Sequence, residues 1–239
     1  MMDTLSPTYN VLISLGIATL PVAIVIWYFW HRDKGEKEPF KLMRKAFLFG
    51  ILVTLPVGVA EVFFELFVKH RLPFLDVYLI IMPFLIIALP EEGAKLWVVL
   101  NSTYKNVKFN EIMDGITYAV LASMGFAVFE NILYTLNYGI EVGILRGFTA
   151  IPAHALFSGI MGFYIGMAKF EKNKKKEKKL IRRGLMAAVF FHGLYDLLLF
   201  TNVTLLMYMI FPLIGYMAFI LNRSIQKANA GIKEEPQYF

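Results

Sequence analysis

The sequence predicts an all-α protein, a polytopic transmembrane helical bundle of about seven spans. Its composition is strongly apolar, because 58% of the 239 residues are hydrophobic, 18% are charged and the mean hydropathy is +0.59. Apolar runs recur along the chain, each close to the roughly 20 residues that a helix needs to cross the hydrocarbon core. Lysine and arginine gather in alternate loops between these runs. We therefore expect residues 1–239 to form a single transmembrane domain.

The apolar runs define where the spans are expected. Each run is bounded by charged or turn-forming residues, and the last two runs lie so close together that a tight hairpin must join them. The expected spans are residues 11–30, 46–68, 77–100, 112–134, 144–168, 184–201 and 204–222.

The loop charges predict the orientation of the bundle. Basic residues fill the loops after the first, third and fifth expected spans and the segment after the seventh, with the densest run between Lys172 and Lys179. The remaining loops carry only Lys69 and Arg71, and Arg146 stands at the mouth of the fifth expected span. The positive-inside rule then places the N-terminus outside and the C-terminus in the cytoplasm of a cell-membrane protein. The net charge of +6 belongs to these loops, so we expect contact with the lipid bilayer and none with nucleic acid.

Ionisable residues within the spans are the main functional signal. A charged group at bilayer depth costs several kcal/mol and normally faces the bundle interior or a wet cavity. Because the chain has no cysteine, a disulfide framework, a thiolate metal site and a cysteine nucleophile are excluded. The intramembrane candidates are Glu91, Glu92, Lys95, Glu130, His154, His192 and Asp196.

The third expected span contains two adjacent glutamates and a lysine. Lys95 follows Glu92 and Glu91 at i,i+3 and i,i+4 spacing, so it can neutralise one of the carboxylates. Neighbouring residues point about 100° apart on a helix. We therefore expect one glutamate to face a cavity while the other pairs with Lys95. Pro90 removes a backbone donor and should loosen the helix just before the pair.

The other candidates have structural alternatives. His154 or His192 alone could bond a carbonyl on a neighbouring helix, and Glu130 alone could make a packing hydrogen bond. His192 and Asp196 are spaced i,i+4 and share a helix face, so the carboxylate could orient the imidazole. The joint presence of all these groups at similar depth favours a functional cluster over isolated packing contacts.

Other polar residues are expected to have structural roles. Glu61 and Glu65 fall toward the outer end of the second span, where an interfacial position is expected. Glu111 and Asp114 precede the fourth span and should cap its helix.

A carboxylate and histidine cluster in a membrane admits more than one function. It could activate water for hydrolysis, either alone or by holding Zn²⁺ through neutral imidazoles and carboxylates. The sequence has no HExxH motif, so the ligands would come from separate helices. The same groups would serve a proton- or cation-coupled transporter. A catalytically silent scaffold that binds a partner helix would require the polar residues to be dispersed.

At these residues the sequence resembles the PrsW family of membrane proteases, which is related to the CAAX-processing and bacteriocin-immunity endopeptidases. The matching elements are Glu91–Lys95 for EExxK, Phe126–Glu130 for FxxxE, the stretch that begins at His154, and His192–Asp196. The resemblance extends from the charged first loop through the sixth expected span.

The resemblance implies a site-1 protease. Such an enzyme cuts a single-pass membrane protein, typically an anti-sigma factor, on its extracytoplasmic side and so switches on a stress response. By this analogy Glu91 is the general base, Glu92 is its partner, and His192 with Asp196 stabilises the oxyanion. Lys95 belongs to the same catalytic motif.

The relatives of CAAX type have a histidine where this motif has Glu130. His154 could replace the lost imidazole, which makes Glu130, His154 and His192 a hypothetical metal-binding set for Zn²⁺. The resemblance leaves open whether these groups hold a water molecule or a metal ion.

Overall fold

The computed structural model describes residues 7–71 and 75–231, which form helices and no strand. The all-α polytopic prediction is confirmed. The helices are α1 (Pro7–Arg32), α2 (Phe40–Arg71), α3 (Leu75–Ile81), the π-helix η2 (Met82–Ala88), α4 (Leu89–Ser102), α5 (Ile112–Tyr138), α6 (Ile140–Phe148), α7 (Ala150–Phe170), α8 (Lys174–Phe200), α9 (Thr204–Met207) and α10 (Ile210–Ala230).

Within the described residues, 6 helical segments are long and apolar enough to cross a membrane. Five of them each correspond to one expected span. The remaining segment, Ile140–Phe170, consists of α6 and α7 and corresponds to the expected span 144–168. The expected span 77–100 has a different construction, because α3, η2 and α4 follow one another there as a composite run. The connection between the last two spans contains the short helix α9.

The composite run changes helix type just before the two adjacent glutamates. Pro83 lies in the first turn of η2 and Pro90 in the first turn of α4, where a missing backbone N–H does least harm. The loosening expected just before the pair takes the form of a change from π-helix to α-helix within a continuous run, and the π-helix begins earlier, at Met82. This change of helix type places Glu91 and Glu92 in the first turn of α4.

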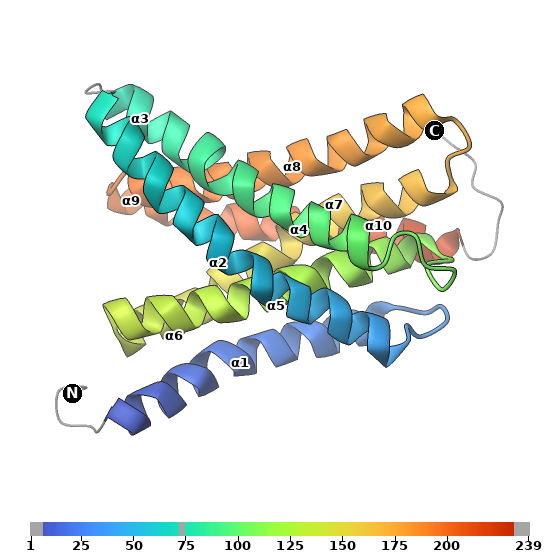
Figure 1. Cartoon of the computed structure of the whole chain (residues 1–239), viewed down its shortest axis with the longest axis horizontal. Coiled ribbons are helices and arrows are strands. Elements are labelled where there is room, and N and C mark those ends of the chain that lie inside the picture. The colour runs from blue at the N-terminus through green and yellow to red at the C-terminus, as the bar shows by residue number, and fades with distance from the viewer. Residues whose placement is uncertain (1–6, 72–74, 232–239) are drawn as a thin grey trace.

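Helix α5 forms the centre of the bundle and is buried along nearly its whole length. It packs against α1, α2 and α7, which surround it in Figure 1. Glycines permit the closest approaches: a Cβ on Gly125 would collide with the backbone of α2, and one on Gly115 with the backbone of α7. Outer helices such as α1, α2 and α10 expose large apolar side chains, as contact with lipid requires.

The loops α1–α2, α4–α5 and α7–α8 lie at one end of the bundle, on the right in Figure 1, together with the end of α10. We call this the basic end, because it carries the lysine-rich segments from Lys34 to Lys45 and from Lys172 to Lys179. Helix α1 begins at the opposite end.

Buried acidic groups fasten the first loop to α5 at the basic end. The Tyr118 hydroxyl donates to the Glu38 carboxylate, and burial together with the negative charge of nearby Asp114 raises the pKa of Glu38 well above its usual range. Asp114 Oδ2 also accepts from the backbone N–H of Glu111 at 2.8 Å. The expected capping role of Asp114 is confirmed.

Candidate active site

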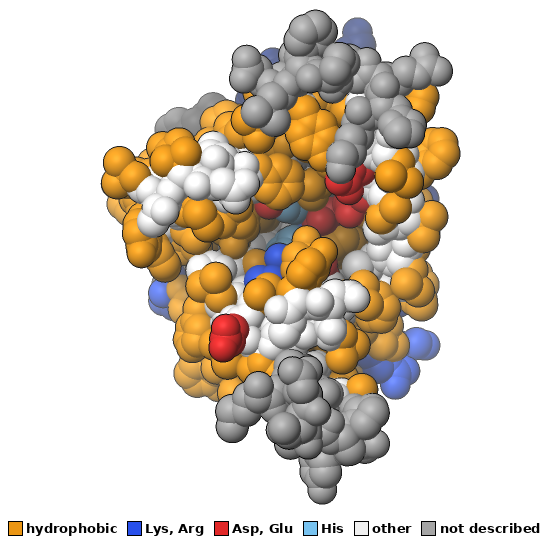
Figure 2. Space-filling model, turned by 90° about the vertical axis from the view of Figure 1, so that its left-hand side faces the viewer, with side chains coloured by type: hydrophobic (Ala, Val, Ile, Leu, Met, Phe, Trp, Pro, Cys, Tyr) orange, Lys and Arg blue, Asp and Glu red, His pale blue; other side chains and the backbone are white. Residues whose placement is uncertain are grey.

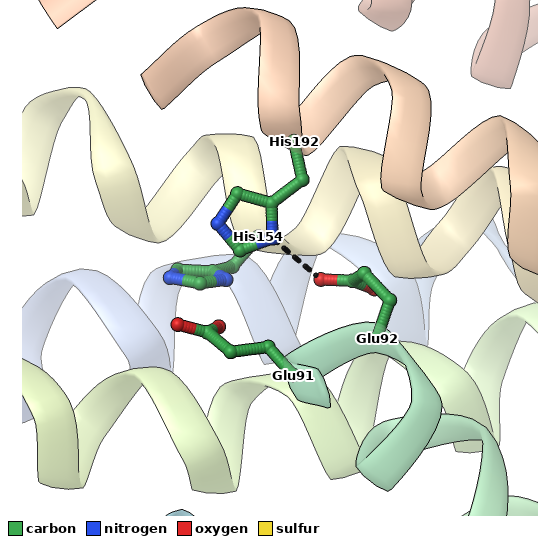
Figure 3. A group of neighbouring side chains, drawn as sticks. All are labelled: Glu91, Glu92, His154 and His192. Atoms are coloured by element: carbon green, nitrogen blue, oxygen red, sulfur yellow. Dashed lines mark hydrogen bonds and ion pairs between the residues drawn. The ribbon is translucent and has the colours of Figure 1, made fainter. Parts of the chain in front are cut away.

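Four candidate residues converge at the start of α4. Glu91 and Glu92 come from α4, His154 from the second turn of α7 and His192 from α8, and Figure 3 shows their side chains directed toward one another. Each offers one ligand atom, and these atoms lie within 4.8 Å of one another. All four side chains are buried. The bundle thus gathers two carboxylates and two imidazoles from three helices.

Lys95 supplies a cation inside this group. Its Nζ lies 3.0 Å from Glu91 Oε2 and 2.7 Å from Glu92 Oε1. The same ammonium lies 3.0 Å from His154 Nδ1 and 4.4 Å from the centre of the Phe126 ring. We expected the lysine to pair with one glutamate while the other faced a cavity, and that expectation is wrong. Both carboxylates contact Lys95, because i,i+3 and i,i+4 neighbours lie on the same side of a helix.

His154 is held between a carboxylate and an ammonium. Its Nε2 lies 2.9 Å from Glu130 Oε2, and its Nδ1 faces Lys95. A carboxylate accepts but cannot donate, so Nε2 carries the proton and Nδ1 accepts from the lysine. Arg146 fixes the other oxygen of Glu130, with Nη2 at 2.7 Å from Oε1. These contacts assign the neutral Nε2–H tautomer to His154.

His192 contacts a carboxylate through each ring nitrogen. Its Nδ1 lies 3.0 Å from Glu92 Oε1, and its Nε2 lies 3.4 Å from Asp196 Oδ2 on the same helix. The Phe157 ring stacks on the imidazole, with centroids 4.7 Å apart and planes 14° apart. The packing and the two acidic neighbours leave the ring little freedom to turn.

The two glutamates differ in how fully they are hydrogen-bonded. Glu92 accepts from Lys95 and His192 at Oε1 and from the Ser158 hydroxyl at Oε2, the last at 3.2 Å. Glu91 accepts only from Lys95 among the described residues. Because its second oxygen has no such partner, Glu91 is the less fully hydrogen-bonded of the two glutamates.

The site lies toward the end of the bundle that is opposite the basic end. Figure 2 views this end and shows a hollow with acidic, histidine and basic side chains at its floor. The side chains of Glu130, Arg146 and Asp196 remain 14–17% exposed, whereas that of Glu92 is 0% exposed. Water can therefore reach the edge of the site from this end, while its centre stays enclosed.

The donor set fits a divalent metal ion such as Zn²⁺. Imidazole nitrogens and carboxylate oxygens are the usual zinc ligands in a cysteine-free site. His154 also has the support that metal-binding histidines commonly show, since a carboxylate holds the nitrogen that faces away from the group. Glu130 is that supporting carboxylate and lies outside the four-residue group, whereas the hypothetical metal-binding set included it. The Lys95 ammonium contacts the same donors, so the lysine and a metal ion would compete for them.

The structure also brings residues to the site that the sequence analysis did not select. Ser158 and Phe157 follow His154 by four and three residues on α7, a helical spacing that could have identified them. Arg146 was counted only among the charges that set the orientation, yet its side chain pairs with Glu130. The sequence shows an arginine near a span end but not which way it turns.

Glu61 was expected at the membrane interface, and the structure corrects this. Its Oε1 is buried and has no hydrogen-bond partner among the described residues. The carboxyl group is within electrostatic range of Glu91, Glu130, Asp196 and Lys95. Glu61 therefore lies near the site, on α2, which packs against α4.

The fold and the site define a class: a multi-pass membrane protein with a buried carboxylate–imidazole centre. Sequence comparison gives the family. A profile of the PrsW family intramembrane metalloproteases matches residues 38–221. The chain belongs to this family and is an intramembrane protease.

Curated relatives support the assignment over most of the chain. Protease PrsW of Geobacillus kaustophilus is 38% identical over 192 residues, which cover 79% of each protein. Protease PrsW of Bacillus subtilis is 32% identical over 217 residues, 91% of this chain and 94% of that protein. Protease PrsW of Clostridioides difficile is 32% identical over 187 residues and 77% of each chain. No solved structure matches.

Proposed function

We propose that the chain is an endopeptidase that cleaves a single-pass membrane protein at the group formed by Glu91, Glu92, His154 and His192. The observation that carries this proposal is the convergence of these four side chains from three helices, buried at the floor of a hollow at one end of the bundle. The shared polar centre argues against a scaffold with dispersed polar residues.

Glu91 is the proposed general base. It has one hydrogen-bond partner where Glu92 has three, so it can accept a proton from water at the smallest loss of existing contacts. The water oxygen then bonds to the scissile carbonyl carbon. When the C–N bond breaks, Glu91 returns the proton to the leaving amine.

In a site without a metal, Lys95 and His192 are the proposed stabilisers of the negative charge that develops on the carbonyl oxygen. Both are donors in a buried site, where electrostatic stabilisation is stronger than in water. Asp196 keeps the His192 ring oriented, and Phe157 stacks on its face. Glu92 is bonded by three donors and holds Lys95 and His192 in place.

The family description includes a metal, and we propose that Glu92, His154 and His192 would hold it. Three protein ligands are the usual number at a catalytic zinc site, and this choice leaves Glu91 as base. The ion would supply Lewis-acid polarisation of the carbonyl and of the attacking water. Glu130 would keep the Nδ1 lone pair of His154 directed into the group.

The proposed substrate is a single-pass membrane protein such as an anti-sigma factor. The positive-inside rule favours a cytoplasmic location for the basic end, so the N-terminus would lie outside and the C-terminus inside. The hollow would then open on the extracytoplasmic side, where the resemblance to site-1 proteases implies cleavage. A segment beside the membrane could enter this hollow.

The test is cleavage of candidate single-pass substrates by purified protein, with and without a chelator. Glu91→Gln and His192→Ala are each expected to lower kcat by about 100-fold or more, as loss of a general base or a charge-stabilising donor does. Glu36→Gln is the matched control, because Glu36 is exposed at the basic end. Cleavage that is unaffected by either site variant would remove these residues from the proposal.

The sequence alone also allowed a proton- or cation-coupled transporter, and membership of a protease family argues against that function. A transporter predicts gradient-driven uptake into vesicles that survives chelation, with no peptide cleaved. That result would replace the endopeptidase proposal.

A further inference from the structure

Arg146 is an almost buried arginine beside the site, although it lies outside the four-residue group. Its Nη2 is 2.7 Å from Glu130 Oε1, and both side chains are 16–17% exposed. The guanidinium carbon lies 3.7 Å from the centre of the Tyr134 ring. Glu130 and Tyr134 are one turn apart on α5, so the guanidinium contacts both side chains at once.

The backbone that carries Arg146 is also fixed to α5. The Asn131 side chain donates to the carbonyl of Gly143 on α6 at 3.3 Å. Arg146 therefore reaches Glu130 from a short helix that is itself anchored beside that glutamate. This anchoring distinguishes it from a surface arginine whose long side chain samples many positions.

The contacts continue from Arg146 into the site. Glu130 uses one oxygen for Arg146 and the other for His154 Nε2, at 2.9 Å. His154 Nδ1 then accepts from Lys95, which contacts both catalytic-motif glutamates. Without Arg146, the Glu130 carboxylate would lose its charge partner. It would then be free to turn away from His154, and the imidazole would lose the contact that fixes its tautomer and orientation.

We infer that Arg146 is a positioning residue of the protease site, which fixes Glu130 and thereby the tautomer and ring orientation of His154. This inference rests on the proposed function, because it assigns the supporting contacts of the same site. Arg146 acts through Glu130 and does not need to touch the substrate.

A double-mutant cycle tests the inference on the full-length protein in detergent. Arg146→Ala should lower kcat by about 10–100-fold, as loss of an outer partner of a site histidine typically does, with KM within about twofold. Arg146→Lys should recover part of the loss, because an ammonium can still pair with Glu130. The double variant Arg146→Ala, Glu130→Gln should have the same kcat as Glu130→Gln alone, because both substitutions interrupt the same series of contacts to His154.

Arg223→Ala is the control, since Arg223 on α10 lies over Phe219, away from the site, and is exposed. The inference is overturned if Arg146→Ala raises KM at unchanged kcat, or if the two substitutions multiply in the double variant. Should Arg146→Ala fail to fold, Arg146→Lys completes the same cycle with Glu130→Gln. If Glu91→Gln abolishes cleavage and Arg146→Ala does not, only this inference fails and the proposed function stands.

Discussion

Replacing Lys95 by methionine tests how the site balances its own charge. The lysine is fully buried, and its ammonium lies 3.0 Å and 2.7 Å from the carboxylates of Glu91 and Glu92. Methionine keeps most of the apolar stem and removes the cation. The substitution therefore leaves two adjacent carboxylates without their shared partner.

The expected cost follows from burial. Removing one member of a buried ion pair typically destabilises a protein by about 3–5 kcal/mol, because the remaining charge has no compensation. Two carboxylates lose a partner here, so we expect Lys95→Met to fall in the upper part of that range. Lys108→Met is the control, because Lys108 and Glu36 form an exposed pair, with side chains 50% and 57% accessible. Such an exposed pair contributes little to the free energy of unfolding.

The assay is unfolding in detergent with and without added Zn²⁺. A ligand that binds only the folded state at 100 times its Kd adds about 2.7 kcal/mol of stability. The Lys95 ammonium contacts the donors that would hold the ion, so Zn²⁺ should stabilise Lys95→Met more than wild type. The reasoning is refuted if the variant is as stable as wild type without metal. It is refuted equally if Zn²⁺ stabilises wild type and leaves the variant unchanged.

Three further outcomes are expected. Folded Glu38 keeps its proton above pH 4.5, where the unfolded chain releases it, so wild-type stability should fall as pH rises from about 4.5 toward the raised pKa. The melting temperature of Glu38→Gln should change less with pH between pH 5 and 8.5. If it fell as steeply as that of wild type, Glu38 would not be the source of the pH dependence. Gly125→Ala should destabilise the bundle by about 1–3 kcal/mol, because the new Cβ meets the backbone of α2, whereas Gly58→Ala meets open space. Equal unfolding midpoints for these two variants would contradict the packing argument. Ser158→Ala removes one donor to Glu92 and should lower kcat about fivefold, for a loss of about 1 kcal/mol, with KM unchanged; a kcat equal to that of wild type would show that this bond is not needed.

The sequence predicted most of the fold because the bilayer constrains it strongly. Each lipid-crossing segment has to satisfy its own backbone and hide its charges, so apolar runs and basic loops mark the helices. The composite run at 75–102 is the exception. Pro90 indicated a break, but the π-helix that starts at Met82 depends on packing against neighbouring helices, which periodicity does not encode.

The candidate site was predictable in its residue types and less so in its contacts. The sequence identified Glu91, Glu92, His154 and His192 as intramembrane groups, and the structure brings them together. The sequence could not show that Glu130 contacts the His154 nitrogen that faces away from the four-residue group, because that contact depends on how α5 and α7 are rotated about their axes. The single-domain assignment for residues 1–239 and the orientation of the termini stay predictions.

The pairing of Lys95 with Glu91 and Glu92 has a consequence for biogenesis. All three residues lie on α4, so the lysine can offset one of the two negative charges before any other helix has arrived. Charged residues in a span raise the free energy of its transfer from the translocon to lipid. A pair within the segment lowers that barrier, so the most highly charged stretch of the site can be inserted as one piece. The histidines from α7 and α8 can then join it after insertion, when the helices associate.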